Sequence, residues 1–268
     1  MNIITLTTDF GLADWFAATM KGVILSIQPD AHIVDMTHDI RPGDIRAGAF
    51  ALAAGCRFFP KATIHVAVVD PGVGSERRAI AVRTSDYFFV GPDNGVLSLA
   101  LAGENIKAIH RITNERLFRH PISNTFHGRD IFAPVAGHLS KGLPVRRLGP
   151  AMKSFVRLPR SKLRRLAESI SGEIVYIDRF GNAITNIGDE ALGSPPDSSP
   201  EVFVRRRSLC FLRPFYQAVP HGKPVAVRGS SGFLEIAVNG CSAENRLRLK
   251  IGDEVTVQLK SPQKTSTS

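Results

Sequence analysis

VVDPGVGSERR, residues 68–78, is the stretch that decides the fold we expect. An apolar run over residues 64–69 ends in the carboxylate of Asp70, and a proline and two glycines follow before the next apolar run, residues 79–82. A β-branched apolar run bounded by Pro and Gly is typical of a buried strand, so Asp70 lies where this strand stops. In open α/β sheets, ligands bind beyond the carboxyl ends of the strands.

Arg77 follows Asp70 closely enough to fold back toward it across the turn. Two interpretations of this pair are open. The two side chains can belong to a ligand site, or Asp70 can cap its own loop while Arg77 is solvated. From this stretch alone the second interpretation is favoured, because turns commonly contain Asp, Pro and Gly.

The flanking segments alternate between strand and helix patterns. A strand pattern over residues 3–7 leads to a second strand-end carboxylate, Asp9, and helical spacing over residues 13–27 follows, with Asp14 as the expected N-cap. The alternation continues with strands over residues 32–36, 79–82, 87–90 and 107–112 and helices over residues 44–59, 96–101 and from residue 125, where Asp130 is the expected N-cap. This order predicts an α/β domain with a mostly parallel sheet covered on both faces.

The pattern changes near residue 150. Residues 150–167 are basic and interrupted by proline, and from residue 172 onward short strand patterns alternate with turns, which is typical of a small barrel or sandwich. We therefore expect two domains and a tail: an N-terminal α/β catalytic domain at 1–160, a linker at 161–171, a C-terminal all-β barrel at 172–262 and a disordered tail at 263–268.

Composition narrows the class of protein. The chain has 268 residues, 43% of them hydrophobic, and no apolar run long enough to span a bilayer. Its N-terminus enters a strand pattern without a basic region or cleavage site, so we expect a cytoplasmic protein. Cys56, Cys210 and Cys241 are far apart and lack metal-site spacing, which indicates reduced thiols. The net charge of +10 is compatible with a nucleic-acid partner, but no nucleic-acid motif or interleaved aromatic residues accompany the basic runs.

Five motifs occur in order along nearly the whole chain: TDFG at 8–11, DPGVG with Arg77 at 70–77, FHGRD at 126–130, DRFGN with TN at 178–186, and GSSGFLEIA at 229–237. Together they resemble the S-adenosyl-L-methionine (SAM) hydrolases that form adenosine. These enzymes are also called SAM hydroxide adenosyltransferases and are related to the fluorinase and chlorinase halogenases. The resemblance implies a Rossmann-like N-terminal domain, a C-terminal β-barrel and a homotrimer whose active sites lie between subunits.

The resemblance also implies the reaction and the catalytic residues. SAM and water give adenosine and methionine by attack of an activated water at C5′, and SAM is a substrate, so no cofactor or metal is implied. Asp70, Arg77 and His127 match the catalytic triad of the family. Fluorinase-type enzymes carry Tyr and Ser in place of Asp70 and His127 and have an extra loop that this chain lacks. Both differences favour water over halide as the nucleophile.

Substrate-binding residues follow from the same motifs. Asp9 matches the carboxylate that binds the ribose hydroxyls, and Asp14 matches a further carboxylate that its helix-capping role explains equally well. Ser231 stands where the halogenases have an arginine, which weakens the clamp on the methionine carboxylate. The other implied contacts are Asp178 and Glu235 at the methionine amine, Ser230 at the methionine carboxylate, Asn182, Val238 and Gly240 at adenine, and Tyr216 stacked on the base.

The residues agree with this chemistry. The sulfonium leaves as a neutral thioether, so no general acid is needed and the task is to deliver a strong nucleophile in a dry pocket. A carboxylate beside an arginine is a weak base. We therefore expect Asp70 to orient the water, Arg77 to stabilise hydroxide character and His127 to accept the proton. Arg78 has similar chemistry, and only the family spacing selects Arg77.

Three alternatives stay open at this point. The first is a SAM-dependent halogenase, which would form 5′-chloro-5′-deoxyadenosine in the presence of chloride. The second is a non-catalytic protein that binds SAM or adenosine without turnover. The third is a nucleic-acid binder with salt-sensitive affinity, which only the net charge supports.

Overall fold

The computed structural model describes residues 3–159, 163–193 and 200–259, and the chain divides into two compact units, Met1–Leu158 and Pro159–Ser268. Each unit has its own hydrophobic core and is described by itself. The predicted tail at 263–268 and the start of the predicted linker lie outside the described residues. In the described part of the chain, no helix combines the length and the apolar character needed to cross a membrane.

The first unit is built on a six-stranded sheet, ordered β2-β1-β3-β5-β4-β6. Pairing is parallel from β2 to β5, and β4 runs antiparallel to both β5 and β6. The sheet is therefore mixed, with β4 as the strand that departs from the predicted parallel arrangement. The strands are β1 (Ile3–Thr8), β2 (His32–Thr37), β3 (Ile64–Val68), β4 (Ala79–Thr84), β5 (Phe88–Pro92) and β6 (Ile106–Arg111).

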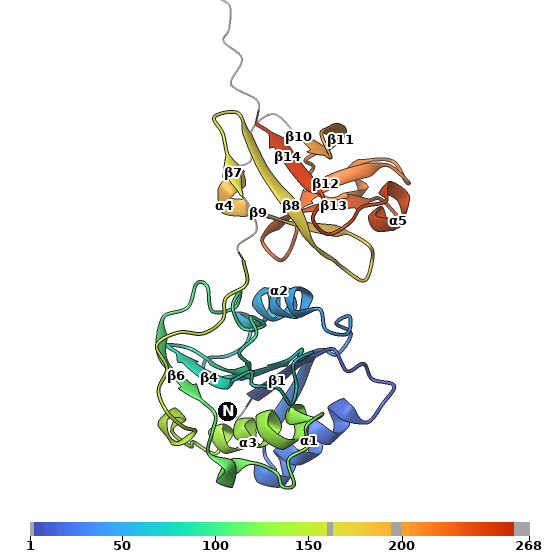
Figure 1. The fold of residues 1–268 in the computed structure, drawn as a ribbon. Coiled ribbons are helices and arrows are strands. Elements are labelled where there is room, and N and C mark those ends of the chain that lie inside the picture. The colour runs from blue at the N-terminus through green and yellow to red at the C-terminus, as the bar shows by residue number, and fades with distance from the viewer. Residues whose placement is uncertain (1–2, 160–162, 194–199, 260–268) are drawn as a thin grey trace, which may run out of the picture. The chain divides into compact units, whose positions relative to one another are not determined.

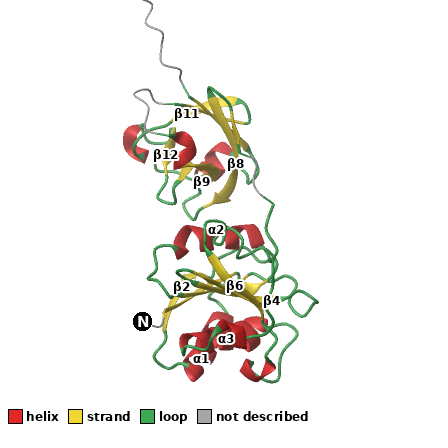
Figure 2. Ribbon diagram, turned by 90° about the vertical axis from the view of Figure 1, so that its left-hand side faces the viewer, coloured by secondary structure: helices red, strands yellow, loops and turns green. Residues whose placement is uncertain are grey.

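Helices cover both faces of this sheet. Figure 1 shows α2 (Ile45–Cys56) on one face and α1 (Phe16–Ile27) with α3 (Ala133–Ser140) on the other, and Figure 2 shows the same layers from the side. The strands β1 and β3 are buried along their whole length, because both of their faces pack against helices. Shorter helical segments are the 3₁₀ turns Glu115–Leu117 and Val145–Arg147 and the π-helix Gly128–Phe132.

Three local predictions in this unit are wrong. The N-cap of α1 is Trp15, not Asp14, and Asp14 is exposed ahead of the helix. Asp130 lies inside the π-helix rather than at a cap, and its carboxylate is buried against Arg129. Residues 96–101 form consecutive turns instead of a helix. By contrast, Asp44 is the N-cap of α2, and its side chain accepts a hydrogen bond from the backbone N–H of Ala47 at 2.9 Å.

The second unit is an eight-stranded, antiparallel sheet in the described part of the chain, ordered β11-β10-β14-β8-β9-β13-β12 with β7 beside β8. A bridge between Leu212 and Ala226 connects its two ends, so the sheet is nearly closed and barrel-like. The strands are β7 (Arg164–Arg165), β8 (Ser169–Ile177), β9 (Ala183–Gly188), β10 (Glu201–Val204), β11 (Arg207–Phe211), β12 (Pro224–Arg228), β13 (Phe233–Val238) and β14 (Glu254–Gln258).

Alternating burial along β8 and β10 gives this unit an apolar interior and a polar exterior. The short helices α4 (Asp189–Leu192) and α5 (Ala243–Leu247) and the 3₁₀ turn Tyr216–Ala218 lie in connections between strands. The strand β7 and the start of β8 fall within residues 161–171, the range predicted as a linker, and they pair with each other there. The apolar pattern by itself does not mark such a short, exposed strand.

Candidate active site

Asp70, Arg77 and His127 meet at one point of the first unit. The Arg77 guanidinium donates through Nε to both Asp70 carboxylate oxygens at 3.0 Å and through Nη2 to Asp70 Oδ2 at 2.5 Å. The same Nη2 donates to His127 Nδ1 at 2.7 Å. The side chains of Arg77 and Asp70 are only 11% and 5% exposed, so this ion pair is largely desolvated. The structure therefore brings together the three residues that sequence reasoning singled out.

The turn after β3 explains how these loops reach one another. Backbone hydrogen bonds from Val73 to Asp70 and from Ser75 to Gly72 close the turn. Gly74 has φ +78°, and a Cβ there would lie 2.3 Å from the carbonyl oxygen of Asn124. A glycine is needed for both reasons, since an L side chain is strained at this φ and would hold the two loops apart. The segment after Asn124 leads directly to His127.

Hydrogen bonding fixes the protonation of His127. Arg77 can only donate, so Nδ1 of His127 is the acceptor and Nε2 carries the ring proton. Burial lowers the pKa of His127, and the Arg77 charge lowers it further, while Asp70 and Asp130 oppose the shift. His127 is thus a neutral imidazole whose remaining ring nitrogen is a donor. This geometry argues against the predicted role of His127 as proton acceptor, because its basic nitrogen is already engaged.

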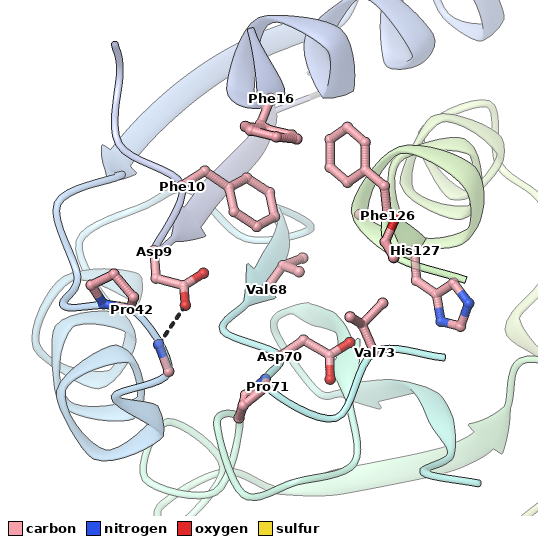
Figure 3. Close-up of a pocket in the computed structure, with 13 residues that line it drawn as sticks. Asp9, Phe10, Phe16, Pro42, Val68, Asp70, Pro71, Val73, Phe126 and His127 are labelled. Atoms are coloured by element: carbon pink, nitrogen blue, oxygen red, sulfur yellow. Dashed lines mark hydrogen bonds between the residues drawn. The ribbon is translucent and has the colours of Figure 1, made fainter. Parts of the chain in front are cut away.

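Asp9 lines the same pocket as Asp70 and His127. The pocket has a volume of about 540 Å³ and opens beyond the carboxyl ends of β1 and β3. Asp9 Oδ2 accepts a hydrogen bond from the backbone N–H of Gly43 at 2.7 Å, which leaves the other carboxylate oxygen available to a ligand. Figure 3 shows the carboxylates of Asp9 and Asp70 on either side of Val68, with His127 beyond Asp70.

Three phenylalanines form an apolar wall on the other side of this pocket. The Phe126 ring meets Phe10 and Phe16 edge to face, with centroids 5.6 and 5.1 Å apart, and Figure 3 shows the three rings grouped together. Such a wall lowers the local dielectric and strengthens the charges opposite it. The sequence analysis did not predict this wall. The signal was present, because Phe10 directly follows Asp9 and Phe126 directly precedes His127 in the two motifs.

A second pocket, of about 650 Å³, lies in the barrel-like unit. Asp178 Oδ1 accepts backbone N–H groups from Phe180 at 2.9 Å and Asn182 at 2.8 Å, and its Oδ2 accepts from the Asn182 side chain at 3.1 Å. The predicted binding residues of this unit all line the pocket: Asp178, Asn182, Tyr216, Ser230, Glu235, Val238 and Gly240. Phe180, Cys241 and Ser242 also line it and were not predicted.

Glu235 is the buried carboxylate of this second pocket. Tyr216 donates its hydroxyl to Glu235 Oε1 at 2.6 Å. Burial raises the pKa of Glu235 and the charge of Asp178 adds to this, while the bond from Tyr216 opposes it. Burial also raises the pKa of Tyr216, as does its bond to Glu235. A cationic ligand group would offset both the burial of Glu235 and the charge of Asp178, so the two carboxyl groups that line this pocket favour a cation.

Asp14 is the remaining predicted site residue. It is exposed on the loop before α1 and is not among the residues that line either pocket.

Comparison with known proteins agrees with the two units. The chain matches the model of the SAM hydroxide adenosyltransferase N-terminal domain over residues 4–149 and that of the C-terminal domain over residues 172–256. It is 41% identical to the (R)-S-adenosyl-L-methionine hydrolase of Salinispora arenicola, covering 95% of this chain and 97% of that protein.

More distant and structural relatives extend this result. A fluorinase from an Actinoplanes species is 28% identical over 95% of this chain and 97% of its own. A crystal structure of a conserved protein from Thermotoga maritima superposes with a TM-score of 0.90 at 38% identity, covering 96% of this chain and 99% of that one. The chain belongs to the SAM hydroxide adenosyltransferase family.

Proposed function

We propose that this protein hydrolyses S-adenosyl-L-methionine to adenosine and L-methionine. The observation that carries the proposal is that Asp70 and His127, joined by Arg77, line one partly apolar pocket together with the Asp9 carboxylate. Its similarity to a protein named (R)-S-adenosyl-L-methionine hydrolase supports the same reaction. SAM is the substrate, and the proposed reaction uses no cofactor.

The reaction is an in-line displacement at C5′. A water held in the pocket attacks the carbon, its oxygen forms the new C–O bond, and the C–S bond electrons leave with methionine as a neutral thioether. The attacking oxygen becomes strongly acidic as the bond forms, so a weak base suffices to take its proton late in the step. Asp70 fits that role because it is a carboxylate at the pocket wall.

Arg77 and His127 have supporting roles in this proposal. Arg77 orients the Asp70 carboxylate with two of its nitrogens and offsets negative charge on the attacking oxygen. His127 donates from Nε2, so it can hold the water by its lone pair while Asp70 accepts one of its protons. The water is thereby fixed at two points, and such positioning contributes several orders of magnitude to a rate.

Substrate recognition is divided between the two pockets. Asp9 accepts hydrogen bonds from the ribose hydroxyls. In the second unit, Asn182 with the backbone of Val238 and Gly240 binds adenine, and Tyr216 stacks on the base. Asp178 and Glu235 bind the methionine amine, and Ser230 binds the methionine carboxylate. The lining of the second pocket supports this division, since it combines carboxylates with amide and hydroxyl groups.

We further propose a homotrimer in which the Rossmann-like first unit of one subunit and the β-barrel second unit of its neighbour complete each site. The family resemblance is the basis for this assembly. Exposed aromatic side chains beside each pocket support it, because Trp15 is 68% and Phe180 is 77% exposed in the single chain.

The decisive experiment incubates the purified protein with SAM and separates the products by chromatography. We expect adenosine and methionine in equal amounts, with no change in product when chloride or fluoride is added. Formation of 5′-chloro-5′-deoxyadenosine as the main product would establish the halogenase alternative instead. Tight adenosine binding without turnover would establish the non-catalytic alternative.

A further inference from the structure

Next to Asp9 begins a chain of four side chains that the proposed reaction does not use, buried at the Thr8 and His38 end. Thr8 Oγ1 and His38 Nδ1 are 2.7 Å apart, and His38 Nε2 is 3.1 Å from Asp35 Oδ1. Asp35 Oδ2 in turn accepts a hydrogen bond from Lys21 Nζ at 2.6 Å. The chain joins the end of β1 to the end of β2 and to α1.

This order of hydroxyl, imidazole and carboxylate is that of a nucleophilic triad, but burial excludes that role. The His38 side chain is 1% exposed and Thr8 is 0% exposed, so no substrate carbon reaches the Thr8 hydroxyl. The Thr8 hydroxyl also accepts the backbone N–H of Phe10 at 3.3 Å. Its proton is then free to go to His38 Nδ1. The ring proton is on Nε2, which lies 3.1 Å from Asp35 Oδ1 but is outside hydrogen-bond geometry in the structure.

We propose that His38 is a positioning residue that sets the Asp9 carboxylate for the ribose hydroxyls. The inference rests on the proposed function, in which Asp9 binds the ribose. Asp9 directly follows Thr8, so the bond between Thr8 and His38 fixes the residue at which the ligand-binding loop leaves the strand.

A second contact from the same histidine supports this role. The backbone N–H of Gly11 donates to the carbonyl oxygen of His38 at 2.8 Å, so His38 holds the Asp9 loop on both sides of Asp9. Further along the segment that begins at His38, the N–H of Gly43 donates to the Asp9 carboxylate itself. The side chain and the main chain of His38 thus join the loop that contains Asp9 to the segment that follows β2.

The negative charge of Asp35 lies close to the imidazole at the far end of the chain. Burial raises the pKa of Asp35, but its bonds to Lys21 and His38 outweigh this and leave the pKa below the ordinary value. An ionised Asp35 selects the ring tautomer with a proton on Nε2, and the same tautomer presents Nδ1 to Thr8. Lys21 and Asp35 are each about one-third exposed, so this end is the more adaptable one.

The test uses matched threonine variants, because His38→Ala risks misfolding at a buried site. Thr8→Val removes the hydroxyl with little change in volume, and Thr8→Ser retains it. Thr7→Val is the control, because Thr7 is a fully buried neighbour on β1 whose Oγ1 has no hydrogen-bond partner in the described structure. Binding of adenosine and of 2′-deoxyadenosine to the full-length protein is measured by calorimetry, and thermal midpoints are recorded for each variant.

We expect wild type to prefer adenosine over 2′-deoxyadenosine by at least about tenfold, as for a hydrogen bond to a charged group. Thr8→Val should reduce that preference about fivefold, the size of one neutral hydrogen bond, and raise KM for SAM more than it lowers kcat. Thr8→Ser and Thr7→Val should keep the wild-type preference. A general loss of stability would weaken both nucleosides equally and leave their ratio unchanged.

The outcomes separate the two proposals. If wild type hydrolyses SAM and discriminates the nucleosides, but Thr8→Val keeps the wild-type ratio, the positioning role of His38 is refuted while the proposed function stands. If wild type neither binds adenosine nor turns over SAM, the proposed function fails and the inference fails with it.

Discussion

Replacing Arg77 with lysine separates the shape of the guanidinium from its charge. Arg77→Lys keeps a cation beside Asp70, but a lysine ammonium is a point charge and cannot reproduce the planar fork. In the structure that fork reaches Asp70 through Nε and Nη2 and His127 through Nη2. The substitution therefore tests whether bridging, and not charge alone, supports turnover.

The expected loss can be worked out from these contacts. A lysine that stays on Asp70 forfeits one of the two donor groups on the carboxylate and the bond to His127. Each is a hydrogen bond that involves a charged group, worth about 1.5 kcal/mol at the low end. Their sum, ~3 kcal/mol, corresponds to a decrease of about 10²-fold in kcat if both bonds hold the water in the transition state.

The assay follows adenosine release by chromatography over a range of SAM concentrations, so that kcat and KM are obtained separately. Arg78→Lys is the matched control. Arg78 is the adjacent arginine, and it is ion-paired with the buried Asp93 carboxylate, whereas Arg77 is ion-paired with Asp70. We expect Arg78→Lys to retain kcat within about twofold, since lysine keeps a cation beside Asp93 and the substitution leaves the contacts of Arg77 in place.

Turnover by Arg77→Lys within about threefold of wild type would refute the bridging argument. An equal loss in Arg77→Lys and Arg78→Lys would refute the choice of Arg77 over its neighbour. Circular dichroism and the thermal midpoint of each variant confirm that the comparison is made between folded proteins.

Three further outcomes are expected. Burial lowers the pKa of His65 from 6.5 to about 4, so between these pH values the unfolded chain binds a proton that the native state excludes. The free energy of unfolding should therefore fall by up to ~3 kcal/mol as the pH decreases through that range. Urea unfolding at several pH values should show that the stability of His65→Gln depends less on pH. Tyr216→Phe removes the bond that lowers the pKa of Glu235, so the acid limb of the pH profile of KM should move to higher pH; an unmoved profile contradicts a role for Glu235 in binding the amine. Gly74→Ala should lower the thermal midpoint and kcat, because its Cβ would meet a backbone oxygen at 2.3 Å, whereas Gly103→Ala, with no atom within 4 Å of the added Cβ, should change neither.

Local patterns accounted for much of the fold. Alternating apolar periods identified most strands of both units, because burial of one or both faces repeats along the chain. The patterns could not show that β4 runs against β5 and β6, since strand direction depends on which neighbours pair. They also missed the π-helix at Gly128–Phe132. Within it, the buried Asp130 carboxylate accepts a hydrogen bond from Arg129 Nε.

The sequence by itself determined that carboxylates follow two strands, Asp9 after β1 and Asp70 after β3. It also determined that His127 stands in a glycine-containing motif. Only the tertiary structure decided how they act. The proton on His127 is fixed by an arginine 50 residues away, and the Asp9 loop is held by a histidine 30 residues from Thr8. Hydrogen-bond direction and burial are properties of contacts between distant segments, so no local pattern in the chain encodes them.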